Sequence, residues 1–148
     1  MLFVSLLSCR ERDYTAAECR ALAAPKAYLD RCMGGTIYGN YIGDLNCWPF
    51  SRPQRLKGVL LGGFESSEFY PQATTFRQVR GTQPKIWFKS DVPIPAPFDR
   101  AKVGLPSAYL VDAEGRLSLC DGWFGHQGQY PREFIVSRFY SATELPLR

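Results

Sequence analysis

The sequence has little of several features that define common protein classes. It has a single histidine, His126, and none of its five cysteines lies in a C-x₂₋₄-C pair, so the usual spacing of a zinc site is missing. Phosphate loops and dinucleotide fingerprints are missing too, because Gly62-Gly63 has neither the glycine spacing nor the following helix that these motifs need. We therefore expect no metal and no other cofactor.

Long apolar runs and dense runs of charge are also lacking. After the opening residues, no stretch approaches the roughly 18 apolar residues that span a bilayer. The formal net charge is +4, but the 18 Lys and Arg residues are scattered among acids rather than gathered in a stripe. Such dilute charge cannot follow a phosphate backbone, so we expect no nucleic-acid partner.

The five cysteines divide into one and four. Cys9 ends an apolar opening, and Leu6-Leu7-Ser8-Cys9 resembles the lipobox of bacterial lipoproteins, although no Lys or Arg precedes it as in an ordinary export signal. The alternative is that residues 2–7 form a buried strand. If Cys9 carries a lipid, an even set remains for two disulfides, as an oxidising compartment would allow. That set is Cys19, Cys32, Cys47 and Cys120.

This division predicts an exported protein. We expect it in the periplasm, or attached to the inner or outer membrane as a lipoprotein whose only membrane contact is the lipid. Residues 1–9 would be the remnant of a signal, and residues 10–148 a single domain, since 148 residues are enough for one core. No feature of the sequence indicates an oligomeric state.

Residues 14–35 predict a short helical segment. Thr15 is a good N-cap with Glu18 three residues later, which is the arrangement of a capping box. Strong helix formers follow over residues 16–24, and a second short helix is expected over 26–33, after a proline and before two glycines.

Cysteines lie both in this segment and in the loop after it. Cys19 and Cys32 would lie on adjacent turns or helices, close enough to bridge, although four cysteines allow three pairings. Residues 36–53 are rich in Gly, Asn, Pro and aromatic side chains, which predicts an ordered loop pinned by Cys47. Trp48 and its aromatic neighbours would either pack back on a sheet or present a platform for sugar rings.

Residues 54–140 predict β structure. Asp112 to Gly115 has the chemistry of a tight hairpin turn, and prolines at alternate positions over 93–97 predict an extended connection. Short strands with strong bends indicate a small barrel. The fold class predicted is α+β, mainly β. The expected strands cover residues 55–64, 85–88, 107–111, 116–124 and 133–140.

Three short motifs carry a resemblance. Gly62 to Glu65, Ile86 to Phe88 and Gly122 to Tyr130 together resemble small uncharacterised bacterial envelope proteins with an OB-like β-barrel, over about residues 54–140. The resemblance implies a barrel fold and an envelope location, and it brings no catalytic residues with it.

The function expected is binding without catalysis, to a protein or glycan partner in the envelope. His126 is either a ligand-contacting or pH-responsive group, or a group that caps its turn by bonding a neighbouring carbonyl or the Glu65 carboxylate. The candidate ligand contacts lie in loops of the barrel and its helical segment. They are Trp48, Trp87, Trp123, His126 and Tyr130.

Two other functions stay open. A small hydrolase would use Cys120 with His126, or Glu65 with Glu68 as an acid pair. A cytosolic protein would instead be a single-stranded nucleic-acid binder, with bases stacked on an exposed aromatic face of the barrel. The aromatic residues available for that face are Phe69, Tyr70, Phe76, Trp87 and Phe88.

Overall fold

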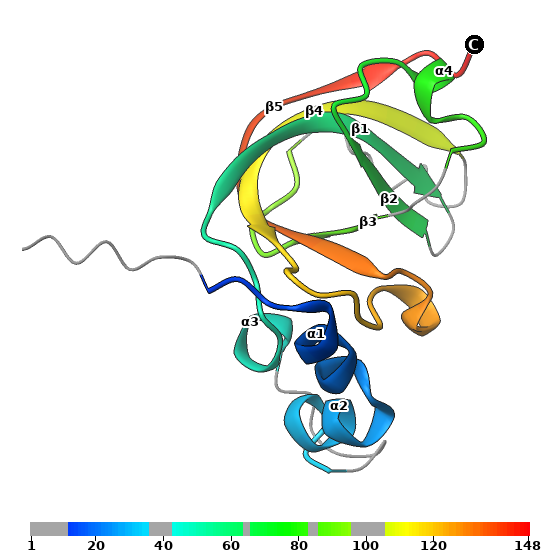
Figure 1. Ribbon diagram of the computed structural model, residues 1–148. Coiled ribbons are helices and arrows are strands. Elements are labelled where there is room, and N and C mark those ends of the chain that lie inside the picture. The colour runs from blue at the N-terminus through cyan, green and yellow to red at the C-terminus, as the bar shows by residue number, and fades with distance from the viewer. Residues whose placement is uncertain (1–11, 36–42, 64–65, 83–85, 96–105) are drawn as a thin grey trace, which may run out of the picture.

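The computed structural model describes residues 12–35, 43–63, 66–82, 86–95 and 106–148 (Figure 1). Cys9 with its lipobox, and Glu65, lie outside the described residues. The helices and strands in chain order are α1 (Ala16–Ala23), α2 (Pro25–Cys32), α3 (Asp44–Cys47), β1 (Gln54–Gly63), β2 (Ser66–Pro71), α4 (Phe76–Val79), β3 (Ile86–Ser90), β4 (Ser107–Leu117), the 3₁₀ turn η2 (His126–Gly128) and β5 (Arg132–Leu145).

The five strands form a closed barrel. Their order around it is β1-β2-β3-β5-β4, and β4 pairs back with β1. All neighbouring strands are antiparallel except β3 and β5, which are parallel. The prediction of a small OB-like barrel with a short helical segment is confirmed.

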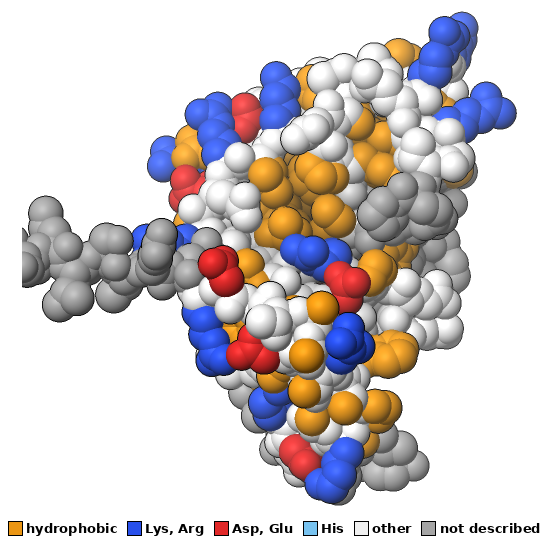
Figure 2. Space-filling view, viewed as in Figure 1, with side chains coloured by type: hydrophobic (Ala, Val, Ile, Leu, Met, Phe, Trp, Pro, Cys, Tyr) orange, Lys and Arg blue, Asp and Glu red, His pale blue; other side chains and the backbone are white. Residues whose placement is uncertain are grey.

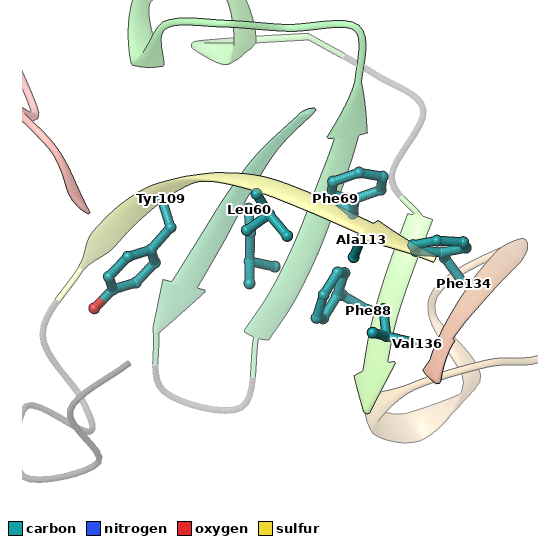
Figure 3. Close-up of a cluster of buried hydrophobic side chains, with 8 residues drawn as sticks. Leu60, Phe69, Phe88, Tyr109, Ala113, Phe134 and Val136 are labelled. Atoms are coloured by element: carbon teal, nitrogen blue, oxygen red, sulfur yellow. The ribbon is translucent and has the colours of Figure 1, made fainter. Parts of the chain in front are cut away.

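Large apolar side chains fill the barrel (Figure 3). Phe69 and Phe134 are fully buried and stack nearly parallel, with their ring centres 5.5 Å apart. Phe88 packs against both rings, so the inside of the barrel is a packed core. The proposed aromatic face for nucleic acid is therefore wrong for Phe69, Phe88 and Tyr70, all of which are buried. The core cluster consists of Leu60, Phe69, Phe88, Tyr109, Val111, Ala113, Phe134 and Val136.

β4 differs most from its prediction. It continues without a break from Ser107 to Leu117, so the hairpin turn at 112–115 and the returning strand at 116–124 are wrong. The register against β5 shifts between Asp112 and Ala113 and again between Glu114 and Gly115, and such bulges bend a strand without reversing it. Gly115 allows the close approach, because a Cβ there would lie 2.3 Å from the carbonyl oxygen of Ile135.

Other strands are longer or additional. β5 extends from Arg132 to Leu145, beyond the expected 133–140. β2 was not predicted, and it places Glu68 within the barrel wall.

The described residues 12–35 and 43–48, here called the helical segment, lie at one end of the barrel (Figure 1). Its capping box is confirmed, since Thr15 accepts a hydrogen bond from the Glu18 N–H and the Glu18 carboxylate accepts one from the Thr15 N–H. The predicted loop contains the short helix α3, and its aromatic residue Trp48 packs back into a core. None of the described helices is long and apolar enough to cross a membrane.

Two disulfides hold the helical segment. Cys19 in α1 bonds Cys120, which follows β4, and Cys32 at the end of α2 bonds Cys47 in α3. Of the three pairings that the sequence left open, the structure has the one in which Cys19 and Cys32 each bond a cysteine from another part of the chain. Two disulfides fit an oxidising, exported location.

The charges of the surface are mixed. On the face shown in Figure 2, Lys and Arg side chains form separate groups with acidic side chains among them. This agrees with the scattered charges in the sequence.

Candidate functional site

A row of three side chains crosses the outer wall of the barrel. Phe88 faces the core, so its neighbours Trp87 and Lys89 face outward by the alternation of a strand. Trp87 lies opposite Glu68 of β2 and Glu133 of β5 in the strand registers. The indole ring of Trp87 therefore lies between two acidic side chains from different strands.

Residues 118–131, the β4–β5 connection, cover this row. Phe124 and Tyr130 exchange two backbone hydrogen bonds of 2.9 and 3.1 Å, which fold the connection into a narrow loop with η2 at its tip. Gly125 presses directly on Trp87, because a Cβ there would lie 2.5 Å from the indole ring. Gly125 also has φ 69°, a conformation that favours glycine. The Tyr130 ring packs beside Trp87, with ring centres 5.0 Å apart.

The helical segment closes the other side. Trp48 is 5% exposed and donates its indole N–H to the Cys120 carbonyl at 3.2 Å. Trp123 donates its indole N–H to the Ala23 carbonyl at 3.1 Å, but the residue remains 53% exposed. One Trp of the junction is thus a packing residue, whereas the other presents its ring to solvent.

A pocket of about 430 Å³ lies between these parts. Its size is within the range of small-molecule sites, and both rings and polar groups line it. The lining residues are Tyr28, Asp44, Trp87, Lys89, Trp123, Phe124, Gly125, His126 and Glu133.

Glu133 is the unusual group of the pocket. It is 2% exposed, and burial together with its hydrogen bond to Asp44 raises the pKa of Glu133 to about 9. At neutral pH the carboxyl group therefore keeps its proton and can donate it to Asp44. The other oxygen, Oε2, is buried and has no hydrogen-bond partner within the described part of the chain.

The charges around Glu133 come from several elements. Lys89 contacts Asp44 with 3.1 Å between Nζ and Oδ2, so one cation partly offsets the acids. Burial alone would lower the pKa of Lys89. The hydrogen bond to Asp44 and the neighbouring acids have the larger combined effect, so the pKa of Lys89 is raised. Burial and the same two acids, Asp44 and Glu133, raise the pKa of the Tyr28 phenol.

The second acid of the row has different surroundings. Glu68 accepts hydrogen bonds from the hydroxyl groups of Tyr70 at 2.8 Å and Tyr130 at 3.2 Å. Burial and this carboxylate raise the pKa of Tyr130 to about 12, so the phenol remains a donor. Glu68 is thus a bonded structural group, which argues against its use as one half of a catalytic pair.

The sequence-predicted residues separate into two groups. Trp87, Trp123 and His126 line the pocket, and they stay candidate ligand contacts. Trp48 and Tyr130 are buried at 5% and 6% exposure and support the pocket from behind, so their assignment as ligand contacts is corrected. Burial of these rings is favourable because both also reach hydrogen-bond partners.

Cys120 does not act as a nucleophile in the disulfide-bonded protein. Its sulfur is bonded to Cys19, so the thiolate that a Cys120–His126 pair requires does not exist.

Sequence reasoning missed the acids and the cation of the pocket. Asp44 lies in the segment predicted as a loop, and Glu133 is the first residue of the strand predicted over 133–140. The one local signal was the position of Glu133 directly before the apolar residues Phe134 to Val136. Among the described residues, no group of three or more His, Cys, Asp or Glu is arranged to hold a metal ion.

Comparison with protein-family models, with curated proteins and with solved structures gave no match.

Proposed function

We propose that this protein is a non-enzymatic envelope protein that binds a glycan in the pocket between the helical segment and the barrel. The observation that carries the proposal is the pairing of two Trp rings, Trp87 and Trp123, with polar groups in one open pocket. Glu133 is buried, and Asp44 and Lys89 are partly exposed. Aromatic rings pack on the apolar C–H faces of sugar rings, while polar groups bond the hydroxyls.

The position of the pocket supports a glycan over a flat protein contact. OB barrels bind oligosaccharides or oligonucleotides on the face of strands 2 and 3 and through the loop between strands 4 and 5. Trp87 belongs to β3, and Trp123 to the β4–β5 connection. The dilute basic charge of the chain and its two disulfides favour the sugar over the nucleic acid.

The arrangement of the acids favours binding without cleavage. Glycosidases hold their two carboxyl groups about 5 to 9.5 Å apart, with the scissile bond between them. Glu133 and Asp44 instead bond one another, which leaves no space for a glycosidic bond between them. The hydrolase alternative based on Cys120 has lost its nucleophile to the disulfide.

The envelope location is part of the same proposal. The two disulfides and the resemblance over residues 54–140 support a periplasmic protein, and the lipobox at Cys9 supports a lipid anchor in the inner or outer membrane. Acyl groups on Cys9 in the protein from its native host, detected by intact mass, would test the anchor. A mass that retains Met1 and no acyl group would contradict it.

The binding proposal is tested by titrating the protein with defined oligosaccharides and following tryptophan fluorescence. Trp123→Ala should weaken sugar binding by at least about tenfold, because an exposed stacking ring is lost. Tyr140→Ala is the matched control, since Tyr140 is also an exposed ring but lies outside the pocket lining. Equal sugar affinity of the two variants would contradict the glycan proposal. The proposal would also fail if no sugar binds and an envelope protein binds tightly through Trp123.

A further inference from the structure

We propose that the pocket selects an aminated sugar, whose ammonium group donates hydrogen bonds to the buried Oε2 of Glu133 and to Asp44. This inference rests on the proposed glycan binding and adds the chemical class of the sugar. The ammonium would donate hydrogen bonds to the carboxylates, and Glu133 would release its proton to water. No covalent bond is made or broken between the sugar and the protein.

No donor among the described residues reaches Oε2 of Glu133, which points to a donor supplied by a ligand. Oε2 is buried in a residue that is 2% exposed, and Glu133 lines the pocket. A buried acceptor without a donor destabilises the protein. A ligand whose N–H group donates to this oxygen therefore gains more binding free energy than it would from an ordinary surface hydrogen bond. An ammonium group has three donors, which is enough for Oε2 and the neighbouring Asp44.

The charges facing Glu133 explain the preference for a cation. The groups that face it are Tyr28 from α2, Asp44 from α3, Lys89 from β3, Asp91 after β3 and His126 from η2. Asp44 and Asp91 are acids, and Lys89 is the cation that opposes them. Ionised Glu133 would add a third negative charge, so the group holds a proton instead. A ligand cation would supply the positive charge that the proton supplies now.

The rings of the pocket add to this preference. An ammonium group is attracted to the faces of Trp and Tyr rings, and Trp87, Trp123 and Tyr28 all line the pocket. A carboxylated sugar would instead place its charge beside Asp44. An N-acetylated sugar would fill the space without the positive charge.

The experiment compares two probes that differ only in acetylation: a glucosamine tetramer and the N-acetylglucosamine tetramer. Isothermal titration at about pH 5.5 is used, because the sugar amines are then protonated while Glu133, with a pKa of about 9, still holds its proton. Measurements in two buffers with different heats of ionisation give the affinity and the number of protons released. We expect the glucosamine tetramer to bind at least about tenfold more tightly than the acetylated tetramer, with release of roughly one proton per site. The acetylated tetramer should release none.

Glu133→Gln is the decisive variant, because glutamine has the shape of the protonated acid but no proton to release. We expect it to lose both the proton release and the preference for the amine. Glu114→Gln is the matched control, since Glu114 bonds Tyr140 outside the pocket lining and should leave both readouts unchanged.

The outcomes separate the two proposals. If the acetylated tetramer binds as well as the glucosamine tetramer and no proton is released, glycan binding stands and the amine inference is wrong. If Glu133→Gln, shown to be folded by circular dichroism, keeps the preference for the amine, the inference is also wrong. If neither tetramer binds, the glycan proposal fails, and the amine inference fails with it.

Discussion

The inside of the barrel and its junction with the helical segment are two cores of different composition. The barrel core is a cluster of buried apolar and aromatic residues (Figure 3). The junction contains a disulfide, Trp N–H groups bonded to carbonyls, a buried acid and an open pocket. The barrel is therefore stabilised by packing, whereas the helical segment is attached by specific bonds that leave space for a ligand.

The helices themselves bury little. α1 contains no buried residue, and the only buried residue of α2 is Cys32. Short helices with so little buried surface are marginal alone, so covalent links supply what packing does not. A ligand site at such a junction can be rigid without being filled by side chains.

The largest effect should come from opening a cavity in the barrel core. Phe134→Ala removes a fully buried ring that stacks on Phe69, and we expect the free energy of unfolding to fall by about 3 to 5 kcal/mol. Urea unfolding measures it, and Leu147→Ala, at an exposed site, is the control with a change within about 0.5 kcal/mol. A loss below about 1 kcal/mol for Phe134→Ala would show that the barrel does not depend on its core.

The disulfides should rank next, and they should differ from each other. Cys19 and Cys120 are 101 residues apart in the sequence, and Cys32 and Cys47 are 15 apart. From chain entropy, removal of the first bridge should lower the free energy of unfolding by at most about 4.7 kcal/mol, and removal of the second by at most about 3 kcal/mol. Alanine pairs at each bridge, compared by thermal unfolding, measure the difference. Limited proteolysis should cut the helical segment before the barrel when the Cys19–Cys120 bridge is absent. Cleavage that begins in the barrel strands would contradict the distinction between the two regions.

The buried acid predicts a pH dependence that belongs to the junction alone. Glu133 has a pKa of about 9 in the folded protein against 4.5 in the unfolded chain, so between these values the folded state holds one more proton. Its contribution to stability is complete below about pH 4.5 and is lost as pH rises toward 9, with a slope of at most about 1.4 kcal/mol per pH unit. Urea unfolding across this range should show a flatter profile for Glu133→Gln than for the natural chain. Identical profiles would mean that Glu133 is ionised in the folded protein.

The smallest effect should come from the capping box of α1. Thr15→Ala removes the side-chain acceptor for the Glu18 N–H, with an expected loss of about 1 kcal/mol confined to the helical segment. Hydrogen exchange should show faster exchange in α1 and unchanged exchange in the barrel strands. Faster exchange in β1 to β5 as well would show that the two regions unfold together.

Local signals predicted the parts of the fold that depend on neighbouring residues. Thr15 and Glu18 marked the start of α1, and the aromatic and branched residues of 107–111 marked the beginning of β4. The hairpin prediction failed because Asp112 to Gly115 has the residues of a turn. In the structure these residues belong to a bulged strand, where Asp112 bonds Arg55 and Gly115 meets the Ile135 carbonyl.

The candidate site was predictable only in part, for a related reason. Trp87, Trp123 and His126 were conspicuous as rare residues in the sequence, and all three line the pocket. Glu133 depends on Asp44 from a distant part of the chain, and no local pattern indicates such a pair. Burial of Trp48 also depends on a long-range contact, its bond to the Cys120 carbonyl.

The three tryptophans can report whether a sugar binds in the pocket between the helical segment and the barrel. Each indole N–H gives its own signal in a ¹H–¹⁵N correlation spectrum, which Trp→Phe variants assign, and the glucosamine tetramer can be titrated against all three. Binding in the pocket predicts shifts for Trp87 and Trp123, which line it, and little or no shift for Trp48, which is buried behind it. Shifts confined to Trp48, or to backbone signals of the barrel away from the junction, would contradict the account.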